Sequence, residues 1–241
     1  MEKARKTLKK SYCCVIPVYN NFPAIEDVVH RTLRVIDKVL IVDDGSTDAS
    51  LQEVFERLPV EVIRHEHNQG KGAALCRALK ILQERNVDYM ITIDGDGQHY
   101  PEDIIGIIDL LEDDDDPVLL AGVRDLNHPA VPGVSRWGRA CSNFFIKLET
   151  GVNVLDSQCG VRAYPVKVIL QKNFTARHYD WESEILLDCA WRGMKIVNFP
   201  VKVYYPQGRE RISHYRKIQD TWRIIKVHIK LLGKQIFRRS R

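Results

Sequence analysis

Two carboxylates, a carboxamide and an imidazole are grouped within one short stretch of the chain. The stretch reads Asp94-Gly-Asp96-Gly-Gln98-His99 and follows the apolar run 89–93, which is typical of a buried strand. Mg²⁺ and Mn²⁺ usually bridge one or two carboxylates to the phosphates of a substrate. These residue types therefore predict a metal site formed by Asp94, Asp96 and Gln98. The alternative is an ordinary polar turn between a strand and a helix, where Asp and Gly are common.

Polar residues end other apolar runs in the same way. Asp44 closes the run 38–44, where its carboxylate can accept hydrogen bonds from a base or ribose, or can cap the next helix. Pro17 and Tyr19 end the run 12–19, where a tyrosine ring can lie beside a base or simply pack at the strand end.

The loop Asn68-Gln-Gly-Lys71-Gly72 opens a helical pattern and resembles a phosphate cradle at a helix N-terminus. It matches neither GxxxxGK[ST] nor GxGxxG, so the nucleotide-binding folds defined by those two motifs are poorly supported. By itself the loop is a weak indicator of phosphate binding.

The elements that must position these residues alternate between strands and helices over the first half of the chain. Strands are expected over 12–19, 38–44, 60–64, 89–93 and 118–121. This order implies right-handed crossovers and a parallel sheet, whose ligands bind outside the carboxyl ends of the strands. Asp44, Asp94 and Arg124 all fall at such ends, which favours one shared site.

The second half is expected to contain a helix over 136–150, a short strand reaching 164, and a helix ending at 191. A strand over 194–203 contains Pro200 and should therefore lie at a sheet edge. The last helix, 218–237, is basic and amphipathic. Its apolar face consists of Trp222, Ile225, Ile229, Leu232 and Ile236. Such a helix can lie on an anionic membrane surface or pack on the domain.

Composition narrows the class of protein. The 241 residues are 44% hydrophobic with a net charge of +4, which is too mild to indicate nucleic-acid binding. The six cysteines show no zinc or disulfide spacing, and no apolar window is long enough for a membrane span. We expect a cytoplasmic protein, soluble or peripheral on the cytoplasmic membrane face.

Six motifs in order give a specific resemblance. PVYN, VDDGSTD, NQGKGAAL, IDGDGQH, GVR and DSQCGVR together resemble family 2 glycosyltransferases of the GT-A fold, over roughly 12–205. Within that family the chain is similar to the polyprenol-phosphate sugar synthases, the dolichyl-phosphate mannosyl- and glucosyltransferases. The resemblance implies an α/β fold with a mostly parallel central sheet flanked by helices.

The resemblance also implies one domain over 1–241. A nucleotide-binding half would cover about 11–124, an acceptor-side half about 125–215, and a C-terminal amphipathic helix about 216–238.

The motifs and the resemblance together assign residues to roles. The nucleotide-sugar contacts are predicted to be Pro17, Tyr19, Asn21, Val42, Asp44, Lys71, Asp94, Gly95, Asp96, Arg124, Arg162, Arg209 and His214. The catalytic group is predicted to be Asp96, Arg124, Glu182 and Glu184. Two departures stand out, because Asn21 occupies a position where the family often has Glu, and the 209–214 loop lacks the Ser-Lys of relatives.

The function implied is metal-dependent, inverting transfer of a sugar from a nucleoside-diphosphate donor of the GDP-mannose or UDP-glucose type. The acceptor would be a polyprenyl or dolichyl phosphate, with Mg²⁺ or Mn²⁺ as cofactor. A lipid phosphate is largely deprotonated at neutral pH and requires no general base. A hydroxyl acceptor would require one, for which Asp180, Glu182 and Glu184 are candidates.

The partners expected are the sugar donor, the lipid phosphate and a membrane surface contacted through the C-terminal helix. A membrane-anchoring partner or a homo-oligomer is also compatible with the resemblance. Two alternatives stay open on the sequence alone: a family 2 enzyme acting on a hydroxyl of a glycan or other lipid, and a non-catalytic nucleotide-sugar-binding subunit.

Overall fold

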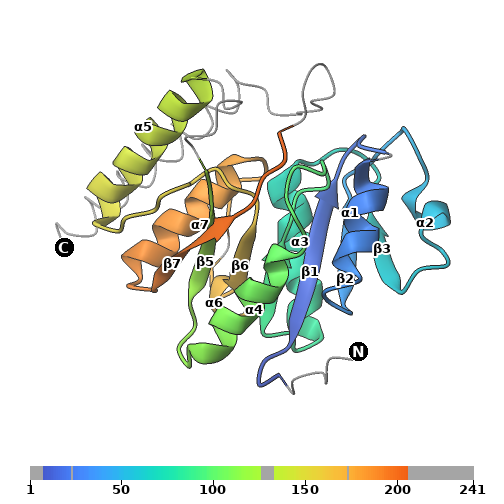
Figure 1. Cartoon of the computed structure of the whole chain (residues 1–241), viewed down its shortest axis with the longest axis horizontal. Coiled ribbons are helices and arrows are strands. Elements are labelled where there is room, and N and C mark those ends of the chain that lie inside the picture. Colours follow the sequence, from blue (N-terminus) through green and yellow to red (C-terminus); the bar gives the residue numbers. More distant parts are fainter. Residues whose placement is uncertain (1–7, 23, 126–132, 173, 206–241) are drawn as a thin grey trace.

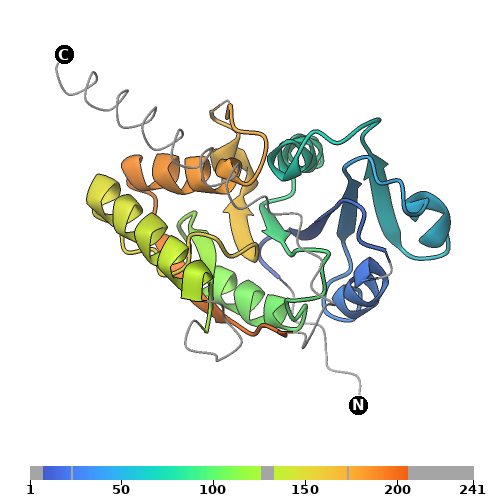
Figure 2. The ribbon, with the colours of Figure 1, turned by 90° about the horizontal axis from the view of Figure 1, so that it is seen from above.

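The computed structural model describes residues 8–22, 24–125, 133–172 and 174–205, which form a seven-stranded sheet with helices on both faces (Figures 1 and 2). In chain order the elements are β1 (Tyr12–Val18), α1 (Ala24–Thr32), β2 (Val39–Asp43), α2 (Leu51–Val54), β3 (Val60–Arg64), α3 (Lys71–Glu84), β4 (Tyr89–Thr92), α4 (Asp103–Asp113), β5 (Leu119–Arg124), α5 (Gly133–Thr150), β6 (Arg162–Pro165), α6 (Val166–Ile169), α7 (Asp180–Trp191) and β7 (Ile196–Val201). The helix predicted over 218–237 lies outside the described residues.

The sheet has the strand order β3-β2-β1-β4-β6-β5-β7. β6 runs antiparallel to both of its neighbours, and every other pairing is parallel, so the expectation of a mostly parallel sheet is confirmed. The Pro200-containing strand β7 lies at one edge of the described sheet, as predicted. The carboxyl ends of β2, β1 and β4 are therefore adjacent, which brings three of the polar motifs together.

The helix between β2 and β3 is short. The residues over 49–58 predict a helix, but α2 covers only Leu51–Val54. Beyond it, the Leu58 N–H bonds to the Phe55 carbonyl at 3.0 Å, a three-residue spacing that tightens the chain into turns. Pro59 follows directly and disfavours helical backbone at the residue before it.

The core forms two layers, one on each face of the sheet. In β1, Cys13 and Val15 pack towards α3 and α7, while Cys14 and Ile16 pack towards α1 and α4. This alternation follows from the two-residue repeat of a strand. Figure 2 shows the two helical layers on opposite sides of the strands. No helix among the described residues has the length and apolar character needed to cross a bilayer.

Tight backbone packing at α3 explains the glycines of the 68–72 loop. A Cβ added at Gly70 would lie 2.3 Å from Nδ1 of His178, and one added at Gly72 would lie 2.5 Å from Cβ of Trp181. The Ala73 N–H also donates to the Arg177 carbonyl at 2.9 Å. The 68–72 loop thus lies at a close contact between α3 and the segment leading into α7, and this contact fixes the position of Lys71. Phosphate binding by the loop stays a prediction.

We expect Gly72→Ala to lower the free energy of unfolding by about 2 kcal/mol, because the added methyl meets backbone that cannot move away. Urea unfolding followed by circular dichroism measures this difference. Gly106→Ala is the matched control within a helix, since its Cβ would meet only the end of the Phe199 ring at 3.0 Å. A Gly72 variant as stable as wild type would contradict the close packing.

Candidate functional site

The carboxyl ends of β1, β2 and β4 gather the predicted nucleotide-binding residues. Pro17 and Val42 pair in register on neighbouring strands, and both are buried. Asn21 lies just past β1 and donates from Nδ2 to the Gly95 carbonyl at 2.8 Å, which ties the end of β1 to the Asp94–His99 turn. Tyr19, which directly follows β1, is partly exposed. The expectation that these motifs share one edge of the sheet is met.

Asp44 contacts protein groups through both of its carboxylate oxygens. Oδ1 lies 2.7 Å from Nδ1 of His65 and accepts from the Gln69 N–H at 2.9 Å, while Oδ2 accepts from the Gly70 N–H at 2.8 Å. The residue is buried. Asp44 therefore shapes the loop 65–70 beside the site. Its predicted contact to a base or ribose stays a prediction.

Lys71 bridges two carboxylates from distant parts of the chain. Its Nζ lies 2.6 Å from Oδ1 of Asp94 and 3.0 Å from Oε1 of Glu182. Burial opposes the charge on this ammonium, but Asp94 and Glu182 raise the pKa of Lys71 above its usual value. The lysine thus links the β4 turn to the first turn of α7.

The two aspartates of the turn have opposite electrostatic environments. Burial opposes ionisation of Asp94, but the positive charge of Lys71 holds the pKa of Asp94 below its usual value. Burial and the negative charge of Asp94 raise the pKa of Asp96 to about 6. Burial also lowers the pKa of His99 to about 4, so this imidazole is neutral near pH 7. Asp96 is the carboxylate whose ionisation an added cation would favour most.

Close approach between two loops brings the 156–162 segment against Asp94. A Cβ added at Gly160 would lie 2.1 Å from Oδ2 of Asp94, and Oγ1 of Thr92 donates to the Gly160 carbonyl at 2.8 Å. Only glycine leaves room for the carboxylate at this position. Both halves of the predicted site therefore meet at β4.

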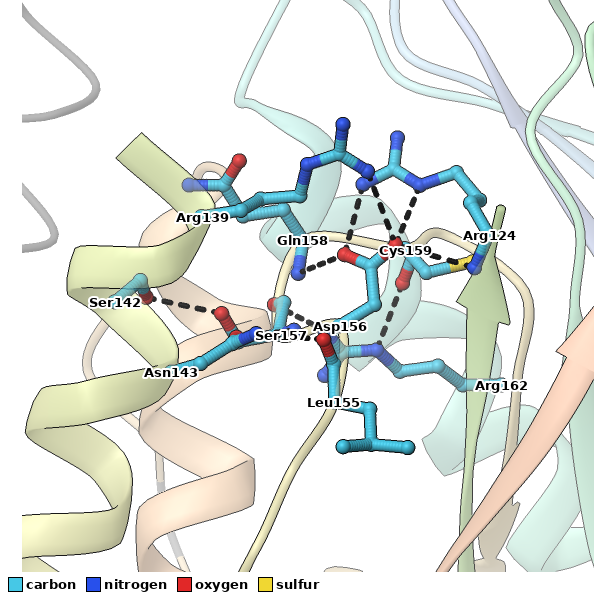
Figure 3. A network of polar contacts seen from close by, with 10 residues as sticks. All are labelled: Arg124, Arg139, Ser142, Asn143, Leu155, Asp156, Ser157, Gln158, Cys159 and Arg162. Carbon is cyan, nitrogen blue, oxygen red and sulfur yellow. Dashed lines mark hydrogen bonds and ion pairs between the residues drawn. The ribbon is translucent and has the colours of Figure 1, made fainter. Parts of the chain in front are cut away.

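Two arginines converge on the carboxylate of Asp156 (Figure 3). Arg124, at the end of β5, donates from Nε to Oδ2 at 2.7 Å and from Nη2 to Oδ1 at 2.9 Å. Arg139 of α5 donates from Nη1 to Oδ2 at 3.3 Å. Burial opposes ionisation of Asp156, but the arginines hold its pKa below the usual value. Burial and the charge of Arg124 lower the pKa of Arg139.

The α5 helix also holds the segment that carries Asp156. Asn143 accepts from the Ser157 N–H at 3.0 Å and donates to the Leu155 carbonyl at 2.6 Å. The hydroxyls of Ser142 and Ser157 are 3.0 Å apart. Arg139, Ser142 and Asn143 were absent from the sequence predictions, because a polar residue within a helical pattern reads as part of an ordinary solvated face.

Arg162 does not fit its predicted role as a donor contact. Its guanidinium is fully buried and donates to the carbonyls of Ser157, Cys159 and Glu182 at 2.6, 2.9 and 2.9 Å. These bonds join the 157–159 turn to α7. Arg162 therefore stabilises the turn beside the site, because its N–H groups donate to backbone carbonyl oxygens.

Glu184 also differs from its predicted catalytic role. Oε2 accepts from the N–H groups of Thr175 and Ala176 at 3.0 and 2.9 Å, and the side chain is buried. Its carboxylate orders the turn before α7. Glu182, by contrast, lies beside Lys71 at the site, while Arg209 and His214 lie outside the described residues.

The amino-acid sequence of the chain matches a known protein family. Residues 13–171 match the family model described as glycosyl transferase family 2. The chain belongs to this family. It is accordingly a glycosyltransferase with a GT-A fold, which confirms the resemblance drawn from the six motifs.

Two family members illustrate the range of relatives. The chain is 29% identical to a UDP-N-acetylglucosamine–dolichyl-phosphate N-acetylglucosaminyltransferase of Methanococcus voltae, over 80% of this chain and 85% of that protein. It is 30% identical to an undecaprenyl-phosphate 4-deoxy-4-formamido-L-arabinose transferase of Pseudomonas syringae pv. syringae, over 74% of this chain and 57% of that longer protein.

A solved structure shows the same fold. Glucosyl-3-phosphoglycerate synthase from Mycobacterium tuberculosis, crystallised with Mn²⁺, UDP and phosphoglyceric acid, superposes with a TM-score of 0.67. The match covers 93% of this chain and 79% of that chain at 20% identity.

The donor set of the Asp94–His99 turn fits a divalent cation in part. Asp96 fits, because burial and the charge of Asp94 raise its pKa, and a bound cation would favour its ionised form. One oxygen of Asp94 is already held by Lys71. Among the described residues no cluster of three or more His, Cys, Asp or Glu side chains surrounds this position. A cation held by Asp96, with Asp94 and Gln98 beside it, would draw its other ligands from donor phosphates and water.

We expect the double variant Lys71→Met/Glu182→Gln to bind Mn²⁺ about tenfold more tightly than wild type in the presence of UDP. The substitution removes the Lys71 ammonium, which competes with a metal for Oδ1 of Asp94, an effect on the order of 1–3 kcal/mol. Replacing Glu182 as well keeps that carboxylate from losing its partner, while Asp94 is left for the metal. Electron paramagnetic resonance of free Mn²⁺ gives the affinity.

Lys80→Met removes an exposed cation from the same helix and serves as the control, with unchanged affinity expected. Weaker or unchanged Mn²⁺ binding by a folded double variant would show that Lys71 does not compete for the metal position.

Proposed function

We propose that this glycosyltransferase transfers a sugar from a nucleoside-diphosphate sugar to a polyprenyl phosphate. The two relatives described above act, by their names, on different sugars, yet both names specify a polyprenyl phosphate. The acceptor is thus the feature that these relatives share, and the proposal carries it to this chain.

The charge balance around Asp156 is the observation that carries the proposal. Arg124 and Arg139 place two positive charges against one carboxylate, and both guanidiniums are largely buried. Burial and the neighbouring charge of Arg124 lower the pKa of Arg139, and an added anion would favour the charged form of this guanidinium. A phosphate monoester supplies that anion, with oxygens suited to guanidinium hydrogen bonds.

The carboxylates near α7 further favour a phosphate over a hydroxyl acceptor. A hydroxyl must lose its proton to a base, whereas a lipid phosphate is already largely ionised at neutral pH. Glu184 uses its oxygens on backbone N–H groups, and Glu182 is paired with Lys71 at 3.0 Å. Neither of these two carboxylates is arranged as an available base, whereas Asp180, the third candidate, is partly exposed and accepts from the His178 N–H at 3.0 Å through one oxygen.

On the donor side, the residues around the ends of β1 and β2 would hold the nucleoside, and the Asp94–His99 turn would meet the diphosphate. Asp96, with Asp94 and Gln98, would hold Mg²⁺ or Mn²⁺, which supplies Lewis-acid stabilisation of a leaving nucleoside diphosphate. Direct displacement by the acceptor phosphate inverts the anomeric centre. A UDP-linked sugar is the first donor to test.

A polyprenyl phosphate lies in a membrane, so the proposal includes peripheral attachment at the cytoplasmic face. The basic segment 216–238 is the part of the sequence predicted to contribute to it.

We expect Arg139→Met to raise the KM for polyprenyl phosphate about ten- to hundredfold while changing the KM for the sugar donor by less than about twofold. The loss corresponds to one charge-assisted hydrogen bond, on the order of 1.5–3 kcal/mol. Initial rates at varied acceptor and saturating donor, and the reverse, separate the two constants.

Arg85→Met removes an exposed arginine that follows α3 and pairs with Glu61 of β3, and it should leave both constants unchanged. An equal rise in the donor KM, or an unchanged acceptor KM in a folded Arg139 variant, would contradict the assignment of this arginine to the acceptor. Absence of transfer to polyprenyl phosphate by the wild type would overturn the proposal itself.

A further inference from the structure

Tyr179 lies beside the ammonium group of Lys71. It directly precedes α7, is half-buried, and the centroid of its ring lies 5.7 Å from Nζ of Lys71. An ammonium is attracted to the face of an aromatic ring at this distance. The helices α3 and α7 lie on the same face of the sheet (Figure 2). The ring is therefore held where these two helices meet the turn that follows β4.

The Lys71–Glu182 pair keeps hydrogen-bonding capacity for a ligand. Nζ of Lys71 contacts Oδ1 of Asp94 at 2.6 Å and Oε1 of Glu182 at 3.0 Å, whereas an ammonium carries three N–H groups. Among the residues that the structure describes, Oε2 of Glu182 has no hydrogen-bond partner. A donor and an acceptor are thus adjacent, each with capacity for a further contact. A sugar hydroxyl both donates and accepts, so it suits such a pair.

This pair lies where a donor sugar would follow the diphosphate. Asp94 belongs to the turn that would meet the diphosphate, and Lys71 joins that turn to α7. Gly160 of the acceptor-side segment packs against Oδ2 of the same aspartate. A sugar placed between the leaving diphosphate and the acceptor would therefore lie beside Lys71 and Tyr179.

Tyr179 offers such a sugar a flat apolar surface. One face of a hexose ring presents C–H groups, which pack against the face of an aromatic ring and exclude water from the contact. The phenol ring is rigid and already held against Lys71, so little conformational freedom is lost when a sugar packs on it.

The charges around Lys71 restrict the kind of sugar. Asp94 and Glu182 are two carboxylates that share one ammonium, and Asp180 adds a third carboxylate in the first turn of α7. A sugar that carries its own carboxylate would be repelled by this arrangement. An uncharged sugar, with hydroxyl or amide groups, has no such penalty.

We propose that Tyr179, Lys71 and Glu182 form the surface that recognises the transferred sugar, and that this sugar is uncharged. We call these three residues the sugar surface. The ring of Tyr179 packs against the sugar, while Lys71 and Glu182 bond to its hydroxyl groups. The inference rests on the proposed function for the donor, because the diphosphate places the sugar there, and it is independent of the acceptor.

The test compares sugar nucleotides with the nucleoside diphosphates that they contain. UDP-N-acetylglucosamine, UDP-glucose and GDP-mannose are titrated by calorimetry into the wild-type chain with Mn²⁺, and the donor that binds most tightly is used. We expect Tyr179→Leu to raise the Kd for this donor about tenfold and to change the Kd for UDP or GDP alone by less than about twofold. Tyr179→Phe keeps the ring and should bind both ligands as the wild type does.

Tyr100→Leu is the matched control, because that ring also lies against a cation, 5.0 Å from the guanidinium carbon of Arg31. It should leave both constants unchanged. Equal weakening of the donor and of the free diphosphate by Tyr179→Leu would overturn the proposal, because the ring would then act only through Lys71. Wild-type donor binding by a folded Tyr179→Leu variant would also overturn it.

A second arm tests the charge of the sugar. UDP-glucuronate is compared with UDP-glucose, and GDP-mannuronate with GDP-mannose, since each pair differs only by a carboxylate at C6. We expect the carboxylate to raise the Kd of the wild type at least about tenfold through repulsion. Equal or tighter binding of the uronate would contradict an uncharged sugar.

The binding results also separate this proposal from the proposed function. If the wild type binds none of the three neutral sugar nucleotides, the donor side of the proposed function fails and the sugar surface fails with it. If a donor binds without help from Tyr179, only the sugar surface is overturned.

Discussion

The buried carboxylate of Asp156 is the interaction on which the acceptor side of the enzyme depends. It is held by Arg124 from the end of β5 and by Arg139 from α5. An ion in this position is tolerated only because both arginines and a neighbouring backbone N–H satisfy it. Its two partners fix α5 relative to the sheet.

A second ion pair joins the two substrate sides. Lys71 connects Asp94 to Glu182, and the glycines beside it allow α3 to lie directly against the segment that enters α7. The ion pairs thus hold the turn after β4 against the first turn of α7.

The sequence allowed much of the fold to be predicted, for identifiable reasons. Alternating apolar runs and helical patterns indicated the parallel strands, and acidic residues at strand ends indicated the shared edge. The roles of individual polar residues were harder to predict. Arg162 and Glu184 satisfy backbone groups, and Arg139 joins a carboxylate 17 residues away. Such partners depend on tertiary packing, to which residue spacing along the chain gives no guide. The glycines of the 68–72 loop likewise reflect a close helix contact that only the folded chain reveals.

The central claim is that the surplus positive charge beside Asp156 receives a lipid phosphate. The most direct measurement compares wild-type transfer from a radiolabelled UDP-sugar to polyprenyl phosphate and to the polyprenol of the same chain length. The account predicts a labelled lipid, cleaved by mild acid, from the phosphate alone. Equal or faster transfer to the alcohol would contradict it, because the two arginines would then not distinguish an anionic acceptor from a neutral one.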